Sequence, residues 1–213
     1  VEEDGADALV EYLVSKDIVV SIGHTNSNYK DVEKAVKAGA TCVTHTFNAQ
    51  KPIHHREVGT AGSALLFDEL YCEAICDGIH LSPHAIKLLW KNKPADKMVL
   101  VTDSLRAKFM PDGEYIEAGN QKVIVKNGAG RLEDGTLAGS TAKMNEAVSN
   151  VMEFVGVDLA AAVKLASENP AKNLGVFDRM GSIKEGKLAN FVIVDKDVNV
   201  YQTIRNGKVI YSK

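Results

Sequence analysis

Hydrophobic positions in the first half of the chain follow two alternating patterns. Residues 6–15 and 28–37 are apolar at every third or fourth position, which is typical of amphipathic helices. Ile18–Ile22 is instead a short, almost continuous apolar run of strand length. Runs of this second kind recur at 41–44, 70–76 and 97–102, and a further helical segment lies at 83–91. Strands that are apolar on both faces and are separated by helices predict a parallel sheet covered by helices.

The pattern changes after Asp103. Turn sequences at Pro111-Asp112-Gly113 and Asn127-Gly128 flank short alternating stretches, which predict antiparallel strands. Helices are expected afterwards, and the chain closes with strands that include a hairpin at Asn206-Gly207. The expected ranges are 114–118 and 121–125 for the first strands, 141–155 and 158–168 for the helices, and 190–195 and 200–212 for the last strands.

Composition narrows the class of protein. The 213 residues carry 25 Lys and Arg against 28 Asp and Glu, so no basic surface favours nucleic acid as a partner. The apolar runs are far shorter than the roughly 20 residues of a membrane span. Three cysteines, Cys42, Cys72 and Cys76, lack metal-binding spacing. We expect them to be free, buried thiols in a reducing cytoplasm.

Candidate chemistry lies where each predicted parallel strand ends. His24, His45, His80 and Asp103 follow four consecutive strands. The carboxyl ends of strands in a (β/α)8 barrel form the rim on which active sites are built. A single histidine at a strand end is more often structural, but four such positions in succession favour a functional site.

The residue types suit hydrolysis at a metal. His24 and His45 are 21 residues apart, the length of one strand–helix unit, so we expect them to be neighbours on the rim. Two neutral imidazoles can hold one divalent metal per site, with Zn²⁺ favoured and Fe, Mn or Co suited to the same ligands. The Asp103 carboxylate can take a proton from an activated water and return it to a leaving group. His80 is left to bind substrate or to polarise a carbonyl.

Ordered motifs along the chain carry a family resemblance. Together they resemble the N-acetylglucosamine-6-phosphate deacetylase family, within the amidohydrolase superfamily, over essentially all 213 residues. The tail Gly181–Asn190 resembles the superfamily's general closing motif and is less specific. The motifs are Gly23-His24-Thr25-Asn26, Thr44-His45-Thr46-Phe47-Asn48-Ala49, His55-Arg56-Glu57-Val58-Gly59, Asp77-Gly78-Ile79-His80, Val101-Thr102-Asp103, Leu137-Ala138-Gly139-Ser140 and Asn169-Pro170-Ala171.

The resemblance implies a role for each candidate residue. His24 and His45 match metal ligands, and Asp103 matches the catalytic base and acid. His80 matches a residue that holds the sugar and its acetamide. The other matches contact substrate: Asn48 and Ala49 the phosphate, Arg56 the phosphate of the neighbouring subunit's site, and Leu137, Ala138 and Gly139 the sugar.

Arg56 also has an independent physical argument. A planar guanidinium grips a phosphate with two parallel hydrogen bonds, which a lysine does not. The alternative for Arg56 is a solvated cation on a loop beside His54 and His55, which are interpreted as loop residues. The role implied by the resemblance predicts a homodimer with composite sites.

The implied fold is α/β, a (β/α)8 TIM-type barrel of which only the C-terminal half is visible, because a closed barrel needs eight strands. We expect this half barrel over 1–175, with a β-hairpin insertion near 112–132, and a β-sandwich segment over 176–213. The family's remaining metal ligand, a Glu, is expected upstream of the chain. The sequence departs from the family at Gln50, where Met is usual, at Ser104, where Ala is usual, and at Asn190, where Asp is usual.

The implied function is metal-dependent hydrolysis of a linear amide C–N bond, which converts N-acetylglucosamine 6-phosphate to glucosamine 6-phosphate and acetate in amino-sugar catabolism. Two alternatives stay open. One is another amidohydrolase that acts on a different amide or a cyclic amide. The other is a catalytically silent fragment that lacks the first half of the barrel.

Several remaining features are interpreted as structural. Ser140 lacks the surroundings of a nucleophile elbow, and Trp90 is assigned to packing. The charge run Glu2–Asp4 is interpreted as solvated. Four glycines without a phosphate-binding pattern are interpreted as turn residues: Gly59, Gly62, Gly128 and Gly130.

Overall fold

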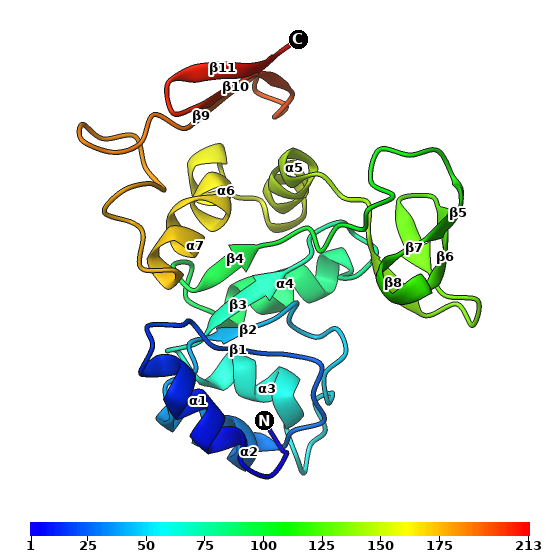
Figure 1. Cartoon of the computed structure of the whole chain (residues 1–213), viewed down its shortest axis with the longest axis vertical. Coiled ribbons are helices and arrows are strands. Elements are labelled where there is room, and N and C mark those ends of the chain that lie inside the picture. Colours follow the sequence, from blue (N-terminus) through cyan, green and yellow to red (C-terminus); the bar gives the residue numbers. More distant parts are fainter.

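The computed structural model describes residues 1–213, apart from the side chain of Ala118. At its centre lies a parallel sheet of four strands in the order β1-β2-β3-β4 (Figure 1). Neighbouring strands pair in register, with Ile22 beside Val43 and Val43 beside Cys72. The predicted parallel sheet is therefore confirmed, with strands shorter than their apolar runs: β1 (Ser21–Ile22), β2 (Cys42–Val43), β3 (Tyr71–Ala74) and β4 (Met98–Leu100).

Helices separate the strands along the chain and cover the sheet. Figure 1 shows α1, α2 and α3 at the β1 end of the molecule and α5, α6 and α7 beyond β4. Helices α5, α6 and α7 contact β4 directly. The helices are α1 (Ala6–Val14), α2 (Tyr29–Lys37), α3 (Gly59–Leu66), α4 (Pro83–Asn92), α5 (Met144–Val155), α6 (Leu159–Ala166) and α7 (Glu168–Asn173).

Helix starts follow ordinary capping chemistry. Asn28 accepts hydrogen bonds from the backbone N–H groups of Lys30 and Asp31, and Asp31 accepts one from Asn28 in return. Ser82 caps α4, whose first residue is Pro83. These side chains satisfy N–H groups that have no partner within the helix, so local sequence alone determines where these helices begin.

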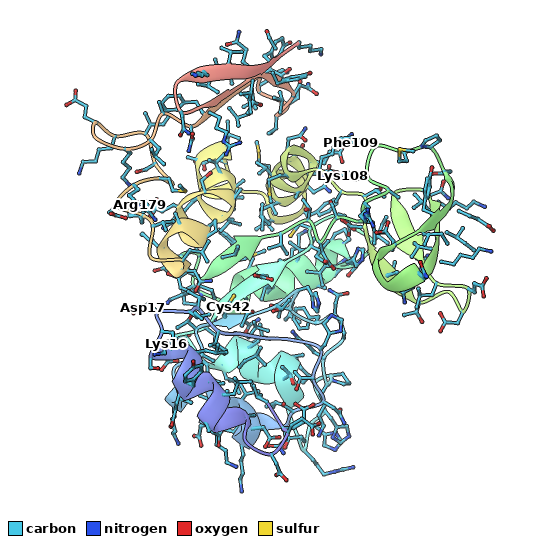
Figure 2. The ribbon with its side chains drawn as sticks, viewed as in Figure 1. Lys16, Asp17, Cys42, Lys108, Phe109 and Arg179 are labelled. Carbon is cyan, nitrogen blue, oxygen red and sulfur yellow. The ribbon has the colours of Figure 1, made fainter. Side chains whose placement is uncertain are left out.

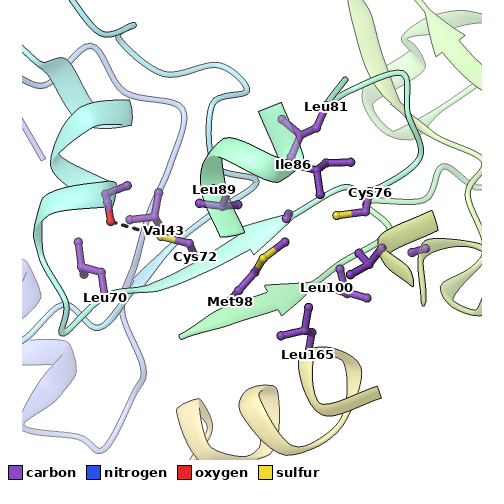
Figure 3. Packing of buried hydrophobic residues seen from close by; sticks show 14 of the residues in the cluster. Val43, Leu70, Cys72, Cys76, Leu81, Ile86, Leu89, Met98, Leu100 and Leu165 are labelled. Carbon is purple, nitrogen blue, oxygen red and sulfur yellow. Dashed lines mark hydrogen bonds between the residues drawn. The ribbon is translucent and has the colours of Figure 1, made fainter. Parts of the chain in front are cut away.

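The core fills the space between the central sheet and its helices. Figure 3 shows Cys72, Met98 and Leu100 on the strands facing Leu89 of α4 and Leu165 of α6. All three cysteines are buried and free, as predicted. Burial raises the pKa of Cys42 and of Cys76 to about 12. Figure 2 labels Cys42, which belongs to strand β2 of the central sheet.

A second sheet, antiparallel and ordered β5-β6-β7-β8, stands to one side of the first (Figure 1). It has a small core of its own around Ala107, Val123 and Val125. Phe109, on the loop that enters this sheet, is 76% exposed and lies at the molecular edge (Figure 2). The elements are β5 (Gly113–Ile116), the 3₁₀ turn η1 (Ala118–Asn120), β6 (Lys122–Lys126), β7 (Ala129–Arg131) and β8 (Leu137–Ser140).

The last three strands form a separate antiparallel sheet in the order β11-β10-β9. Asn206 and Gly207 both have positive φ, 49° and 76°, as the predicted hairpin turn requires. This sheet leaves large apolar side chains exposed, among them Val192, Val209 and Ile210. Its strands are β9 (Phe191–Val194), β10 (Val200–Arg205) and β11 (Lys208–Ser212).

The turn interpretation is wrong for three of the four glycines. Gly59 and Gly62 belong to helix α3, which was not predicted, and Gly130 belongs to strand β7. Each lies where a side chain does not fit: a Cβ on Gly59 would be 2.6 Å from the carbonyl oxygen of Lys51, and one on Gly130 would be 2.1 Å from a methyl of Leu105. These glycines allow close packing; Gly128, with φ of 83°, lies in a turn as predicted.

Two smaller points complete the fold. Trp90 of α4 packs against the main core, as predicted. Among the described residues, no helix combines the length and the apolar character that a membrane crossing needs.

Candidate functional site

Each of the four parallel strands is followed by the predicted polar residues. His24 follows β1, His45 follows β2, His80 follows β3 and Asp103 follows β4. Three of these residues have left-handed backbone, with φ of 44° at His24, 30° at His45 and 48° at Asp103. Such conformations cost roughly 1–3 kcal/mol each outside glycine and concentrate at functional sites. The strained backbone at these strand ends therefore indicates that the orientation of His24, His45 and Asp103 is functionally important.

His24 and His45 face each other across the first two strand ends. Their Nε2 atoms are 2.9 Å apart, and their rings meet edge to face with centroids 4.7 Å apart. His45 is only 7% exposed, and among the described residues its Nδ1 has no hydrogen-bond partner. Two ring nitrogens this close need a proton or a cation between their lone pairs. The predicted pair of metal ligands is thus brought together.

The pair is an incomplete metal site by itself. Within the part of the chain that the structure describes, no group of three or more His, Cys, Asp or Glu residues is arranged to hold a metal ion. Two imidazole nitrogens nevertheless suit a divalent metal such as zinc, which needs further ligands besides these two. The two histidines are ligands of the kind that the predicted metal prefers, but two ligands are too few to hold it.

His80 is held by a buried carboxylate. Its Nδ1 lies 2.6 Å from Asp77 Oδ2, and both side chains are less than a tenth exposed. The N–H groups of Ile79 and His80 donate to the other oxygen, Asp77 Oδ1, each at 2.8 Å. Burial alone would raise the pKa of Asp77, but these hydrogen bonds outweigh burial and lower the pKa. The His80 Nε2 is buried without a partner among the described residues, so it is available to a ligand.

Asp103 is fixed by strand β8. Its carbonyl oxygen accepts a hydrogen bond from Ser140 N at 2.9 Å, and the Ser140 carbonyl accepts one from Leu105 N at 2.8 Å. A Cβ on Gly139 would lie 3.2 Å from the Asp103 carbonyl oxygen, so the two backbones are in close contact. The predicted sugar-lining segment, Leu137, Ala138 and Gly139, is therefore adjacent to the backbone of Asp103, the predicted catalytic residue.

The turn after β2 closes against the turn after β1. Thr25 N donates to the Ala49 carbonyl, and Lys51 N donates to the Thr25 carbonyl, each at 3.1 Å. An open cavity of about 500 Å³ lies here. It brings a predicted metal ligand, His24, next to a predicted phosphate contact, Ala49, while Asn48 lies half-buried one residue before. The lining residues are Glu2, His24, Thr25, Asn26, Ala49, Gln50, Lys51 and Pro52.

Arg56 lies apart from this cavity, on an exposed loop. Its guanidinium donates to His55 Nε2 at 2.7 Å, and its backbone N–H donates to His54 Nδ1 at 3.2 Å. The two histidine rings pack together with centroids 4.1 Å apart. Among the described residues, those that line the cavity do not include Arg56, so within one chain the predicted phosphate contacts are not all brought together.

Glu2 is exposed, in line with its interpretation as a solvated charge, but its carboxylate also makes specific hydrogen bonds. Its Oε1 accepts a hydrogen bond from Asn26 N at 2.8 Å, and its Oε2 accepts hydrogen bonds from the hydroxyls of Thr25 and Ser27. Burial opposes ionisation of Glu2, but the hydrogen bonds that it accepts from Thr25, Ser27 and Asn26 lower its pKa. Glu2 thus fixes the turn that follows His24.

Glu73 in β3 was missed by sequence reasoning. Its Oε2 accepts a hydrogen bond from His45 N at 3.3 Å, and its carbonyl oxygen accepts one from Thr46 N at 2.8 Å. Burial raises the pKa of Glu73, and the hydrogen bond from His45 opposes that rise in part. A charged residue in the middle of an otherwise apolar parallel strand was the signal that could have identified it.

Comparisons with known proteins agree with this arrangement. The chain matches the amidohydrolase family over residues 1–210. It is 44% identical over 210 residues to an N-acetylglucosamine-6-phosphate deacetylase of Bacillus subtilis, an alignment that covers 99% of this chain and 53% of the relative. It is 36% identical to an N-acetylgalactosamine-6-phosphate deacetylase of Escherichia coli O157:H7, covering 98% of this chain and 55% of the relative. The chain thus spans about half the length of the curated relatives it matches.

Solved structures give the same result. An N-acetylglucosamine-6-phosphate deacetylase from Thermotoga maritima is 43% identical and superimposes with a TM-score of 0.92, covering 98% of this chain and 57% of that one. An N-acetyl-D-glucosamine-6-phosphate deacetylase from Mycobacterium smegmatis, in complex with N-acetyl-D-glucosamine-6-phosphate, is 33% identical with a TM-score of 0.94. That alignment covers 99% of this chain and 56% of the Mycobacterium chain.

Proposed function

The chain belongs to the amidohydrolase family, and we propose that it supplies the catalytic residues of a metal-dependent deacetylase acting on N-acetylglucosamine 6-phosphate. The observation that carries this proposal is the strand-end arrangement, with the His24–His45 pair followed by His80 and Asp103 on the next two strands. Relatives that match nearly the whole chain and bear this enzyme's name support it.

For the fold, we propose the C-terminal half of a (β/α)8 barrel over 1–175 and a β-sandwich segment over 176–213. Four parallel strands with intervening helices support the half barrel. The sheet β9–β11, with apolar side chains left exposed, supports the sandwich. In this arrangement the whole protein adds a carboxylate that completes the metal ligands of His24 and His45.

In this proposal the metal lies between the side chains of His24 and His45. His24 and His45 would hold it through their facing Nε2 atoms. When bound, a divalent metal supplies Lewis acidity, which lowers the pKa of a bound water toward about 7 and polarises a carbonyl. Zinc suits these ligands, and Fe, Mn and Co suit them too.

Residues of the chain itself transfer the proton and hold the substrate carbonyl. Asp103 accepts the proton of the attacking water at a carboxylate oxygen and delivers it to the amine nitrogen as the C–N bond breaks. His80, fixed by Asp77 at Nδ1, donates a hydrogen bond from its Nε2–H to the acetamide carbonyl. The products are acetate and the free amine of glucosamine 6-phosphate.

Phosphate binding anchors the substrate far from the reacting bond, so that its binding energy positions the amide. We assign this role to Asn48, Ala49 and Arg56, with Leu137, Ala138 and Gly139 along the sugar. Since Arg56 lies outside the cavity of its own chain, we propose that it reaches the site of a second subunit in a homodimer. The free thiols suit a reducing compartment, and we place the enzyme in the cytoplasm.

A second candidate substrate differs only in sugar stereochemistry. The Escherichia coli relative is named for N-acetylgalactosamine 6-phosphate, whose acetamide and phosphate are the same groups. The residues assigned to the phosphate and to the acetamide face these shared groups, so they do not by themselves discriminate between the two sugars.

Acetate release by the full-length protein tests the function. We expect release from N-acetylglucosamine 6-phosphate with added Zn²⁺, and little from unphosphorylated N-acetylglucosamine. Faster release from N-acetylgalactosamine 6-phosphate would favour the second candidate. Equal release from phosphorylated and unphosphorylated sugars would point instead to an amidohydrolase with a different substrate.

Asp103→Asn tests the assigned chemistry. We expect kcat to fall about 10²- to 10⁴-fold because general acid–base catalysis is lost, while metal content stays unchanged. Near-normal turnover by Asp103→Asn contradicts the mechanism.

A further inference from the structure

The segment between β2 and helix α3 contains an unusually strained turn. His45, Phe47 and Ala49 all have left-handed backbone, with φ of 30°, 78° and 48°. None of them is a glycine, so each is held in a conformation that its side chain disfavours. Such a turn persists only where surrounding contacts determine it. The question is therefore which group holds this turn in place.

The side chain of Gln50 spans the turn from the inside. Its Nε2 donates to the Thr44 carbonyl at 2.8 Å, and its Oε1 accepts from Phe47 N at 3.0 Å. Within the part of the chain that the structure describes, neither of these two backbone groups has another hydrogen-bond partner of its own. Gln50 therefore ties the residue before His45 to a residue after it.

The backbone of Gln50 connects the same turn to the other histidine. Gln50 and Thr25 form an isolated parallel bridge, and Thr25 directly follows His24. The residues on either side of Gln50 make the two hydrogen bonds of this bridge: Ala49 O accepts from Thr25 N, and Lys51 N donates to Thr25 O. Gln50 thus lies between the two histidine-bearing turns and lines their shared cavity.

We propose that Gln50 is the positioning residue that couples the metal ligand His45 to the phosphate contacts Asn48 and Ala49. This inference rests on the proposed function, because it takes the roles of those three residues from it. One amide holds the turn at Thr44 and at Phe47, so its loss releases His45 on one side and Asn48 and Ala49 on the other. Metal affinity and phosphate binding should therefore change together.

In this chain both contacts depend on an amide at position 50. A carbonyl oxygen needs a donor and a backbone N–H needs an acceptor, and only an amide side chain supplies both at once. Methionine has a similar length and volume but neither group. Glutamate keeps the acceptor for Phe47 N and, when ionised, places a negative oxygen against the Thr44 carbonyl.

The test compares Gln50→Met and Gln50→Glu with the wild type in the full-length protein. Gln121→Met is the matched control, because Gln121 is exposed and directly precedes β6 of the second, antiparallel sheet. Zinc affinity is measured by competition with a chromophoric chelator, without substrate. Binding of the phosphorylated sugar is measured as KM for N-acetylglucosamine 6-phosphate and as Kd for glucosamine 6-phosphate. Circular dichroism confirms that each variant is folded.

For Gln50→Met we expect zinc affinity to fall about 10- to 100-fold, as for other groups that orient a ligand, with a parallel rise in KM and Kd. Gln50→Glu should show the same changes, because the hydrogen bond to the Thr44 carbonyl is replaced by repulsion while the one from Phe47 N remains. Gln121→Met should match the wild type. If Gln50→Met fails to fold, Gln50→Glu decides the question.

Two outcomes overturn the inference. Wild-type zinc affinity in both folded Gln50 variants shows that His45 does not depend on Gln50. A fall in zinc affinity with unchanged sugar binding shows that the two are not coupled. Absence of deacetylase activity in the wild type is a separate result, since it refutes the proposed function while zinc and sugar-phosphate binding still report on Gln50.

Discussion

Asp77 fixes both the position and the charge environment of His80. The carboxylate contacts the His80 ring at 2.6 Å and also receives two backbone N–H groups. A histidine fixed at Nδ1 presents Nε2 in one orientation, which is what a group that holds a substrate carbonyl requires. A single buried carboxylate thus determines the geometry of a functional side chain three residues away.

The lowered pKa of Asp77 predicts a pH dependence of stability. Since its folded-state pKa lies below its ordinary value of 3.8, Asp77 stabilises the fold fully above about pH 4. That contribution is lost as the pH falls through the folded-state pKa. We expect the wild type to lose more stability than Asp77→Asn between pH 5 and pH 2, measured by urea denaturation. Asp178→Asn, at an exposed position, is the control, and parallel pH profiles for the wild type and Asp77→Asn contradict the assignment.

At the scale of secondary-structure elements, strand β8 supports the site through its last residue, Ser140. Ser140 is fully buried; its hydroxyl donates to the Thr102 carbonyl and accepts from Ala142 N. Its backbone pairs with Asp103 and Leu105. Ser140 is not a nucleophile, as the sequence indicates, but it holds the left-handed turn that carries Asp103.

Ser140→Ala should therefore reduce stability and catalysis together. Two buried backbone groups lose their partner, which costs about 1–3 kcal/mol of unfolding free energy. We expect kcat to fall more than KM rises, because Asp103 is displaced while the phosphate contacts remain. Thermal denaturation and steady-state kinetics measure the two effects, with the exposed Ser212→Ala as control. A stable variant with normal kcat shows that β8 does not position Asp103.

The elements that carry the site could be predicted, because strand ends and caps are local in sequence. Apolar runs locate all four parallel strands, and the histidines just after the first two, His24 and His45, lie in contact. Helix α3 could not be predicted, since its small residues show no apolar stripe and are chosen for close packing against distant backbone. Glu73 and Gln50 were not identified as positioning residues because their partners depend on the tertiary turn after β2.

Arg56 raises a question at the scale of the whole molecule. Its guanidinium is exposed and separate from the cavity it is proposed to serve. If each site borrows Arg56 from a second subunit, two variants that are each impaired at low substrate concentration can complement each other. An Arg56→Ala subunit retains Asp103, and an Asp103→Asn subunit retains Arg56, so a mixed dimer contains one complete site.

We expect coexpression of Arg56→Ala and Asp103→Asn subunits to recover about a quarter of wild-type activity, the share expected when half the dimers are mixed and each has one working site. Arg56→Ala alone should mainly raise KM, so the assay uses substrate well below that KM. The proteins mixed without subunit exchange serve as control. No recovery in dimers shown to be mixed indicates that Arg56 acts within its own chain.

The three buried cysteines can report when the central sheet opens, because their thiols react only when they are exposed. Burial raises the pKa of Cys42 and Cys76 to about 12, so at pH 7 their thiols stay un-ionised and an alkylating reagent barely reacts with the closed form. Alkylation must wait until the sheet opens, and its rate relative to an unfolded thiol measures the free energy of that opening. Cys42 and Cys72 lie on adjacent strands and Cys76 lies just beyond β3. Their separate labelling rates would therefore show whether the edge near the histidine pair opens independently of the core, without any probe being introduced.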